Sequence, residues 1–517
     1  MDSKKKTPKV DSSTATSLNK PAKDSKISTH IGAESAFDSQ LVELQKVDSR
    51  KNAQSLNKPQ AAGLCGKNTR AESAFDTKAA GGRIFDEKAG LCSGEQGDKT
   101  CGLSTQRATN SPLFRKKPTP KMKKPNDSAI LQVYSRLPII FNKGQGVYLY
   151  DTQGREYLDF GAGIAVNALG YGNTAFNTAL KEQIDKLLHI SNLYYNLPAI
   201  EAATKLAKAS GLDRVFFTNS GAEACEGALK VAKKYAYEKG IKSPQIIAMK
   251  DSFHGRTLGA LSVTGNSAYQ KPFKPLLSGV KFARFNDIAS VERLITPKTC
   301  AIMLETIQGE GGVTPASKEF LHAMRKLCDR HDMLLILDEI QCGMGRSGSM
   351  FAYEQYGIMP DIITTAKALG CGVPVGAFVL SQKVADLSLK PGDHGSTYGG
   401  NPFVCAAVSK VFDIFEELQL VQRVIKLTPS LTQVLQELCD RYDFLHSVRG
   451  KGFLQGVQID PKSKIQAKHI VQLAIEEGLI ILSASHNVLR FAPPLIITQE
   501  HIELMRQRLT RALDRVS

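Results

Sequence analysis

Short apolar runs alternate with longer amphipathic stretches through most of the chain. The runs are too short for helices, which is typical of strands buried on both faces of a parallel sheet. Between several of them, apolar positions recur with helical spacing, as at 222–238 and 318–331. The expected strands are 214–217, 245–249, 300–304, 333–337 and 362–364. This alternation predicts an α/β fold in which helices cover both faces of a mainly parallel sheet.

Two further patterns flank this central region. Residues 147–151 and 157–159 are apolar segments on either side of a glycine-containing turn, which predicts a β-hairpin. Residues 408–517 have helical patterns around one more pair of strands, which predicts a smaller α+β unit. We therefore divide the globular part into an N-terminal segment at 129–175 that packs with the small domain, a large domain at 176–407 and a small C-terminal domain at 408–517.

The first 128 residues differ in composition from the rest of the 517-residue chain. They are rich in Ser, Lys, Ala, Gly, Asn and Asp, contain no Tyr and show no sustained apolar period. Such a segment buries too little surface to offset its ordering entropy. The short sequences SLNKP and AESAFD each recur once, but two copies are too few for a stacked repeat fold. We expect a disordered, low-complexity extension.

The net charge of +17 is concentrated in this extension, because residues 1–126 hold 24 Lys and Arg against 13 Asp and Glu. A basic run at 115–125 suits a solvated linker better than a nucleic-acid or membrane-surface site. No run of eighteen apolar residues, secretory signal pattern or zinc-type cysteine pair occurs. We expect no membrane, nucleic-acid or metal partner, and a cytoplasmic protein, with the mitochondrial matrix as the alternative in a eukaryote.

One candidate binding loop lies between an expected strand and an expected helix. Residues 218–223 read Thr-Asn-Ser-Gly-Ala-Glu. A small-residue loop that opens a helix exposes backbone N–H groups and the positive end of the helix dipole, which suits a phosphate. Taken alone, the same residues also fit an ordinary helix cap.

Two charged residues follow other expected strands. Asp338 comes directly after 333–337, at the sheet edge where ligands of α/β proteins bind. A carboxylate there can keep a pyridinium nitrogen protonated, although a helix-capping Asp has the same pattern. Lys367 follows 362–364, where partial desolvation lowers the pKa of an amine and lets it attack an aldehyde. Most lysines at strand ends are solvated, so Lys367 alone is weak evidence for a reactive amine. The evidence is the combination of the loop at 218–223, Asp338 and Lys367 in this order.

Five motifs in order resemble those of the class III aminotransferases, which use pyridoxal 5′-phosphate. They are 218–223, Phe253-His254-Gly255-Arg256-Thr257, Asp338 with Gln341, Lys367, and 395–402. Within this family, the stretches 158–167, 308–313 and 490–495 are most similar to those of the acetylornithine aminotransferases. The resemblance begins at about residue 130 and implies fold type I of the pyridoxal-phosphate-dependent transferases, with the cofactor in the large domain.

The resemblance implies how the cofactor is held. Lys367 forms a Schiff base with its aldehyde, Asp338 binds the ring nitrogen, Phe253 stacks on the ring, and Gln341 hydrogen-bonds the phenolic oxygen. Lys367 and Asp338 are thus the catalytic residues. The phosphate is bound by Ser220, Gly221 and Ala222, together with Thr397 of the partner subunit. A homodimer with shared active sites is therefore implied.

The resemblance also implies the substrate contacts. Arg256, whose planar fork matches a carboxylate, binds the α-carboxylate of the donor, with Asn167 or Ser396 nearby. Arg490 binds the α-carboxylate of glutamate or 2-oxoglutarate. Glu310 pairs with Arg490 while an ω-amine donor is bound and releases it for the second substrate. An ordinary ion pair is the alternative for Arg490 and Glu310.

The implied reaction transfers the terminal amino group of N2-acetylornithine to 2-oxoglutarate, giving N-acetylglutamate 5-semialdehyde and glutamate in arginine biosynthesis. Ornithine aminotransferases usually have tyrosine where this chain has Ile164. An aliphatic residue suits an acylated amine, which needs no charged partner. Ornithine, succinylornithine and 4-aminobutyrate are alternative donors. An alternative of another class is a non-catalytic scaffold that is recruited through the basic extension. The presence of Lys367, Asp338 and Arg256 argues against it.

The chain departs from the usual pattern of the family at several positions. Cys225 replaces an asparagine, Thr306 replaces a proline, and Cys371-Gly372-Val373 interrupts a glycine run. Cys342 and Met344 stand where Thr and Ile are usual. We expect none of these residues to touch a proposed catalytic group, so that they alter pocket shape and donor preference but leave activity intact.

Overall fold

The computed structural model describes residues 127–516. The predicted disordered extension at 1–128, with its repeats and its basic run, therefore lies almost entirely outside the described residues.

The centre of the fold is a seven-stranded sheet with the order β4-β12-β11-β10-β7-β5-β6. Each neighbouring pair without β12 is parallel, and β12 is antiparallel to both β11 and β4. The prediction of a mainly parallel sheet is thus confirmed, and the five expected strands are present to within one residue at each end. The strands are β4 (Arg214–Thr218), β5 (Gln245–Met249), β6 (Val280–Ala283), β7 (Thr299–Glu305), β10 (Leu334–Asp338), β11 (Ile362–Thr365) and β12 (Gly376–Leu380).

The two faces of this sheet carry separate apolar cores. Ile246 and Ile336 pack in one cluster with residues of α5 (Gly221–Glu238). Their strand neighbours Ile247 and Leu335 pack in another cluster with residues of α9 (Lys318–His331). Because successive residues of a strand point to opposite faces, α5 and α9 cover opposite sides of the sheet. The predicted helix at 222–238 begins one residue earlier, and that at 318–331 matches α9.

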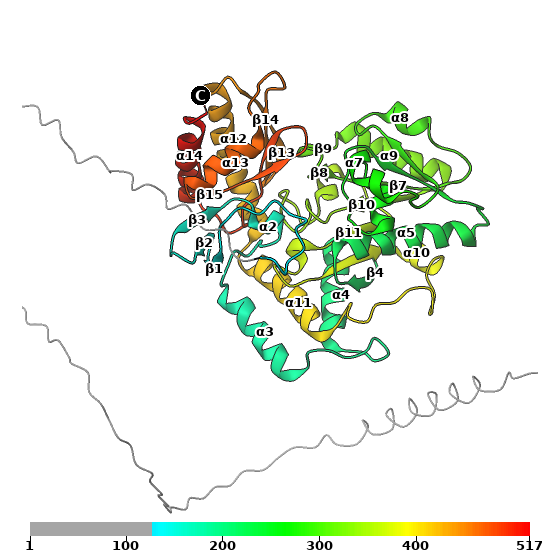
Figure 1. Ribbon diagram of the computed structural model, residues 1–517. Coiled ribbons are helices and arrows are strands. Elements are labelled where there is room, and N and C mark those ends of the chain that lie inside the picture. The colour runs from blue at the N-terminus through cyan, green and yellow to red at the C-terminus, as the bar shows by residue number, and fades with distance from the viewer. Residues whose placement is uncertain (1–126, 517) are drawn as a thin grey trace, which may run out of the picture. The chain divides into compact units, whose positions relative to one another are not determined.

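A second sheet joins segments that are far apart in the sequence. β1 (Phe141–Gln145), β2 (Tyr148–Asp151) and β3 (Glu156–Asp159) form an antiparallel ribbon, which confirms the predicted hairpin. β15 (Leu479–Ile480) extends it by pairing in parallel with β3. Figure 1 shows the cyan ribbon beside the orange and red C-terminal elements.

The C-terminal region contains a four-stranded antiparallel sheet with the order β13-β14-β17-β16. The prediction of a single strand pair at 408–517 is therefore wrong. Most residues of β13 are polar or glycine, and only its first residue is fully buried, so no apolar run marks this strand. The strands are β13 (Leu445–Lys451), β14 (Leu454–Ile459), β16 (Leu482–Ala484) and β17 (Val488–Phe491).

Smaller elements complete the described chain, in which no helix is both long and apolar enough to cross a membrane. The predicted domain borders stay a prediction, and α11 runs across the one at 407/408. The remaining elements are β8 (Ile307–Gln308), β9 (Thr314–Pro315), α2 (Ala162–Ala165), α3 (Thr174–Lys186), α4 (Leu197–Ser210), α6 (Leu258–Val263), α7 (Ser267–Gln270), η1 (Lys271–Phe273), α8 (Ile288–Glu292), η2 (Ala352–Tyr356), η3 (Lys367–Leu369), α10 (Gln382–Asp386), α11 (Pro402–Glu417), α12 (Leu420–Arg441), α13 (Ala467–Glu476) and α14 (Gln499–Leu513).

Candidate active site

Residues at and beyond the carboxyl ends of β4, β5, β7, β10 and β11 line a cavity of about 420 Å³. These strands run in one direction, so their carboxyl ends meet along one edge of the sheet, where ligands of α/β proteins bind. The cavity therefore lies at the edge of the sheet where the sequence predicted a ligand. The predicted site residues that line the cavity are Ser220, Gly221, Ala222, Phe253, Arg256, Asp338, Gln341 and Lys367.

One part of the cavity wall is the N-terminus of α5. Ser220 is the N-cap residue, and its Oγ accepts a hydrogen bond from the backbone N–H of Glu223 at 3.2 Å. The backbone N–H groups of Gly221 and Ala222 belong to the first turn, where a helix offers them no acceptor of its own. Together with the positive end of the helix dipole, these donors fit a phosphate group.

Glycines bring this helix terminus close to the sheet. A Cβ atom on Gly376, the first residue of β12, would lie 2.4 Å from the carbonyl oxygen of Ser220. A Cβ atom on Gly221 would lie 2.8 Å from the Ile340 side chain. Larger residues at either position would force the loop away from the strand ends.

Lys367 follows β11 and has a φ of +47°. Residues other than glycine rarely adopt this left-handed conformation, and such strain is concentrated at functional sites. The half-buried side chain lines the cavity. Desolvation lowers the pKa of Lys367, and this effect outweighs the opposing charge of Asp338. The amine is therefore shifted toward its neutral, nucleophilic form.

Asp338 ends β10 with only 3% of its surface exposed. Its Oδ1 accepts the backbone N–H of Ile340 at 3.0 Å. Its Oδ2 lies 2.6 Å from Nδ1 of His254, in the loop after β5. A carboxylate fixed in this way on the cavity wall fits a protonated ring nitrogen of a cofactor.

His254 is a site residue that sequence reasoning missed, although it stands inside a quoted motif next to Phe253. Its imidazole is buried, and burial alone would lower its pKa, but the hydrogen bond to Asp338 and the charge of that carboxylate raise the pKa overall. Among the described residues, Nε2 of His254 has no hydrogen-bond partner. The imidazole of His254 therefore donates a hydrogen bond from Nδ1 to Asp338.

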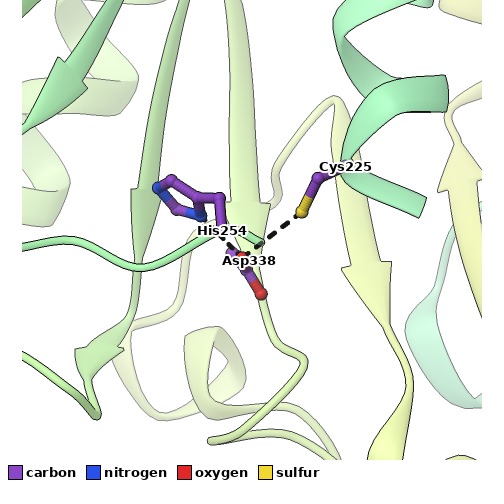
Figure 2. Close-up of side chains that lie close together, drawn as sticks. All are labelled: Cys225, His254 and Asp338. Atoms are coloured by element: carbon purple, nitrogen blue, oxygen red, sulfur yellow. Dashed lines mark hydrogen bonds and ion pairs between the residues drawn. The ribbon is translucent and has the colours of Figure 1, made fainter. Parts of the chain in front are cut away.

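Cys225 contradicts the expectation that none of the unusual residues touches a proposed catalytic group. Its Sγ lies 3.6 Å from Oδ2 of Asp338, on the side away from His254 (Figure 2). The expectation was wrong because Cys225 and Asp338 are far apart in sequence, and only the packing of α5 against the sheet brings them together.

The group of Cys225, His254 and Asp338 consists of residue types that bind metals. The 2.6 Å between Nδ1 of His254 and Oδ2 of Asp338 is a hydrogen-bond length. Two ligand atoms on a tetrahedral zinc ion are separated by about 3.3 Å, given bonds of about 2.0 Å. The geometry therefore fits a shared proton better than an ion.

Glu305, the last residue of β7, is a second buried carboxyl that the sequence did not single out. It accepts the backbone N–H of Phe253 at 3.1 Å and that of Gly309 at 3.2 Å. Desolvation raises its pKa to about 7, with the neighbouring His254 acting in the opposite direction. Glu305 thus ties the loop that carries Phe253 and His254 to the turn after β8.

The structure pairs Arg490 with Glu310, as the resemblance implied. Nη1 of Arg490 lies 2.5 Å from Oε1 of Glu310 and donates to Oε1 of Gln341 at 3.0 Å. The Arg490 side chain is 3% exposed and that of Glu310 31%. Because Gln341 receives this bond on its oxygen, its amide nitrogen is left to donate toward the cavity.

Arg256 is exposed and lines the cavity. Its guanidinium carbon lies 3.7 Å from the centre of the Tyr269 ring and 5.5 Å from that of Phe253. Stacking on these rings orients the planar fork without engaging it in an ion pair. No ion pair is recorded for Arg256 in the described part of the chain, so it has the capacity to bind a carboxylate.

Besides Arg490 and Glu310, four predicted residues lie outside the cavity lining. Asn167 donates to the Tyr171 hydroxyl at 3.2 Å, and Ser396 accepts the side chain of Asn219, a lining residue, at 3.3 Å. Thr397 lies in a separate hollow with residues 189–193. Ile164, the fourth, is 44% exposed.

Ile164 belongs to a left-handed turn at α2. Ala162, Gly163, Ile164 and Ala165 have φ values of +47°, +62°, +66° and +61°. A left-handed turn costs about 1–2 kcal/mol for each residue other than glycine. Oδ1 of Asp159 accepts the backbone N–H groups at 161 and 162, which holds the start of the turn in place.

Comparison with known proteins agrees with this geometry. The family model of the class III aminotransferases matches residues 130–513. This chain belongs to the class III aminotransferases. As a member of that family it is a pyridoxal-phosphate-dependent aminotransferase of fold type I, and the helix terminus, Asp338 and Lys367 supply groups that fit the phosphate, ring nitrogen and aldehyde of the cofactor.

Three members of the class III aminotransferases illustrate what this chain is similar to. An acetylornithine aminotransferase from Methanocaldococcus jannaschii is 47% identical, over 75% of this chain and 95% of the relative. A succinylornithine transaminase from Yersinia pseudotuberculosis is 44% identical, over 77% and 98%. The crystal structure of an ornithine aminotransferase from Toxoplasma gondii has a TM-score of 0.72 and 33% identity, covering 75% of this chain and 93% of that one.

The lowered pKa of Lys367 leads to a prediction about this aminotransferase. Only a neutral amine attacks an electrophile, and a lower pKa makes the neutral form available at lower pH. In cofactor-free protein, labelling of Lys367 by an amine-reactive reagent should reach its half-maximal rate at a lower pH than labelling of Lys383, whose side chain is 65% exposed. Timed labelling followed by peptide mass spectrometry measures both lysines in one sample, and equal midpoints would contradict the prediction.

Proposed function

We propose that this aminotransferase moves the terminal amino group of N2-acetylornithine to 2-oxoglutarate, giving N-acetylglutamate 5-semialdehyde and glutamate in a reversible step of arginine biosynthesis. The observation that carries the proposal is the 47% identity to an acetylornithine aminotransferase across almost its whole length. Succinylornithine is the second candidate donor, supported by a relative at 44% identity. We place the reaction in the cytoplasm.

The cofactor is held by groups on three sides of the cavity. Pyridoxal phosphate supplies an aldehyde that binds amines and a ring that accepts electrons. Backbone N–H groups of Gly221 and Ala222 and the Ser220 hydroxyl would bind its phosphate. Phe253 would pack on its ring, and the Gln341 amide would donate to its phenolic oxygen.

Two residues carry out the proton chemistry. Asp338 holds a proton on the ring nitrogen, which strengthens the ring as an electron acceptor. Nζ of Lys367 would hold the cofactor through its aldehyde. With substrate bound, the neutral Nζ would be placed to accept a proton from the substrate carbon that bears the amine and to deliver it to the aldehyde carbon of the cofactor. The reverse transfer completes the second half-reaction.

Two arginines bind the substrate carboxylates, one in each half-reaction. Arg256 binds the α-carboxylate of the acylated donor through its stacked guanidinium. Glu310 neutralises Arg490 at this stage, so that no unpaired charge faces the uncharged arm of the donor. The α-carboxylate of 2-oxoglutarate then takes the place of Glu310 on Arg490. The partial exposure of Glu310 leaves it room to withdraw into solvent.

We further propose a homodimer in which Thr397 of the partner subunit binds the phosphate. The hollow that contains residue 397 also includes Leu193. Leu193, Tyr195 and Leu197 are 86%, 95% and 79% exposed, which marks this face for burial by another chain.

The assignment of Lys367 is tested by Lys367→Ala. This change should abolish both borohydride-reducible cofactor attachment and turnover, because Lys367 is the one lysine among the described residues that line the cavity. The matched control Lys383→Ala removes an exposed lysine on α10 and should leave both unchanged. Absorbance and intact mass measure attachment, and undiminished transamination by Lys367→Ala would refute the assignment.

Donor choice is tested by following the first half-reaction spectrally with N-acetylornithine, succinylornithine, ornithine and 4-aminobutyrate. N-acetylornithine should give the highest kcat/KM. Ile164→Tyr should shift the ratio of N-acetylornithine to ornithine by about tenfold toward ornithine, since a hydrogen-bonding group at a polar substrate atom is worth at least that much. Ile200→Tyr, at another exposed isoleucine, is the control. A wild-type preference for free ornithine would overturn the proposed donor.

The shared site is tested by mixing Lys367→Ala with Thr397→Ala chains at limiting cofactor. If Thr397 serves the neighbouring site, each mixed dimer has one site with both changes and one wild-type site. The mixture should then exceed the activity of either variant alone. Activity no greater than the average of the separate variants would show that the sites are not shared.

A further inference from the structure

Cys225 lies in the second turn of α5, fully buried behind the cavity wall. Its Sγ is 3.6 Å from Oδ2 of Asp338 and 3.8 Å from Oγ1 of Thr364 on β11. Both distances are within hydrogen-bonding range for sulfur. Figure 2 shows Cys225 and His254 approaching Asp338 from two sides.

The sulfur of Cys225 acts as a donor in this setting. Burial, followed by the negative charge of Asp338, raises the pKa of the Cys225 thiol well above its usual range, so the S–H proton is retained. Of its two possible acceptors, the carboxyl group of Asp338 is nearer than the hydroxyl of Thr364.

We propose that Cys225 is a positioning residue, whose thiol donates to Oδ2 of Asp338 and holds the carboxylate in the orientation that faces the ring nitrogen of the cofactor. This inference rests on the proposed role of Asp338. Oδ2 then receives the imidazole N–H of His254 and the thiol of Cys225, while Oδ1 receives the backbone N–H of Ile340. Three donors from three segments fix the plane of the carboxylate.

The alternatives to donation have different consequences. A merely space-filling Cys225 would be replaceable by an apolar residue of similar size. A donor would be replaceable by serine, whose hydroxyl makes the same kind of bond. The change to serine is informative because a buried hydroxyl without an acceptor is costly, whereas here the carboxyl group of Asp338 is in place as an acceptor.

The first measurement is the infrared S–H stretching band in cofactor-free protein. The band of Cys225 is obtained as the difference between the wild type and Cys225→Ala. Cys405 on α11 is the matched control, because it is equally buried and burial alone raises its pKa. We expect the Cys225 band at a lower frequency than the Cys405 band, and Asp338→Asn should move it upward.

The second measurement is the dissociation constant of pyridoxal phosphate. Cys225→Ala and Cys225→Val should each raise it about 3- to 10-fold, the range that one net hydrogen bond contributes. Cys225→Ser should stay within about twofold of the wild type. Cys405→Ala should leave cofactor binding unchanged. Thermal unfolding of each cofactor-free variant separates a loss of fold from a loss of positioning.

Two results would overturn the inference. One is a Cys225 band that has the same frequency as the Cys405 band and does not move in Asp338→Asn. Such a result would show that the thiol makes no hydrogen bond to Asp338. The other is a shifted band with unchanged cofactor binding in Cys225→Val, since the bond would then position nothing. Failure of the underlying role of Asp338 is distinguishable, because Asp338→Asn would then shift the band without weakening cofactor binding.

Discussion

The active site depends on supplying hydrogen-bond donors to one carboxyl group in the protein interior. A buried carboxylate without partners costs several kcal/mol or takes up a proton. Asp338 avoids this through the 2.6 Å contact with His254, the backbone N–H of Ile340 and the thiol of Cys225. These groups come from the loop after β5, the chain after β10 and the helix after β4. They reach Asp338 together only because the strand order of the sheet brings these segments to the same place. The same edge also carries Lys367.

Conformational strain is the second cost of this site. Lys367 and three residues of the turn at 162–165 adopt left-handed angles without being glycine. Neighbouring hydrogen bonds hold this geometry, with Oδ1 of Asp159 bound to two backbone N–H groups and Oδ2 bound to the Tyr171 hydroxyl at 2.6 Å. The strand β3, which carries Asp159, is itself anchored by β15 from the C-terminal region. The ends of the described chain are therefore coupled to the site.

How well each element was predicted follows from its burial. β7 and β10 are buried throughout and form uninterrupted apolar runs, so they were found to within one residue. β13 is mostly half-buried and polar, and β16 has only three residues, so the C-terminal sheet was predicted as one pair of strands. The cavity residues after parallel strands were predictable because the direction of such strands fixes the edge at which they end.

The sequence by itself determined the α/β fold, the edge of the sheet at which the cavity lies, and the residues 220–222, Asp338 and Lys367 in the cavity wall. Each of these follows from local pattern and strand direction, or from motifs shared with a family. Only the tertiary structure decided that His254 and Cys225 contact Asp338, that Glu305 joins two loops, and that Arg490 binds both Glu310 and Gln341. Apart from the bond between Glu305 and Gly309, which are 4 positions apart, these contacts join residues 52 to 180 positions apart. Periodicity along the chain does not show which side chains face each other across a packed interior.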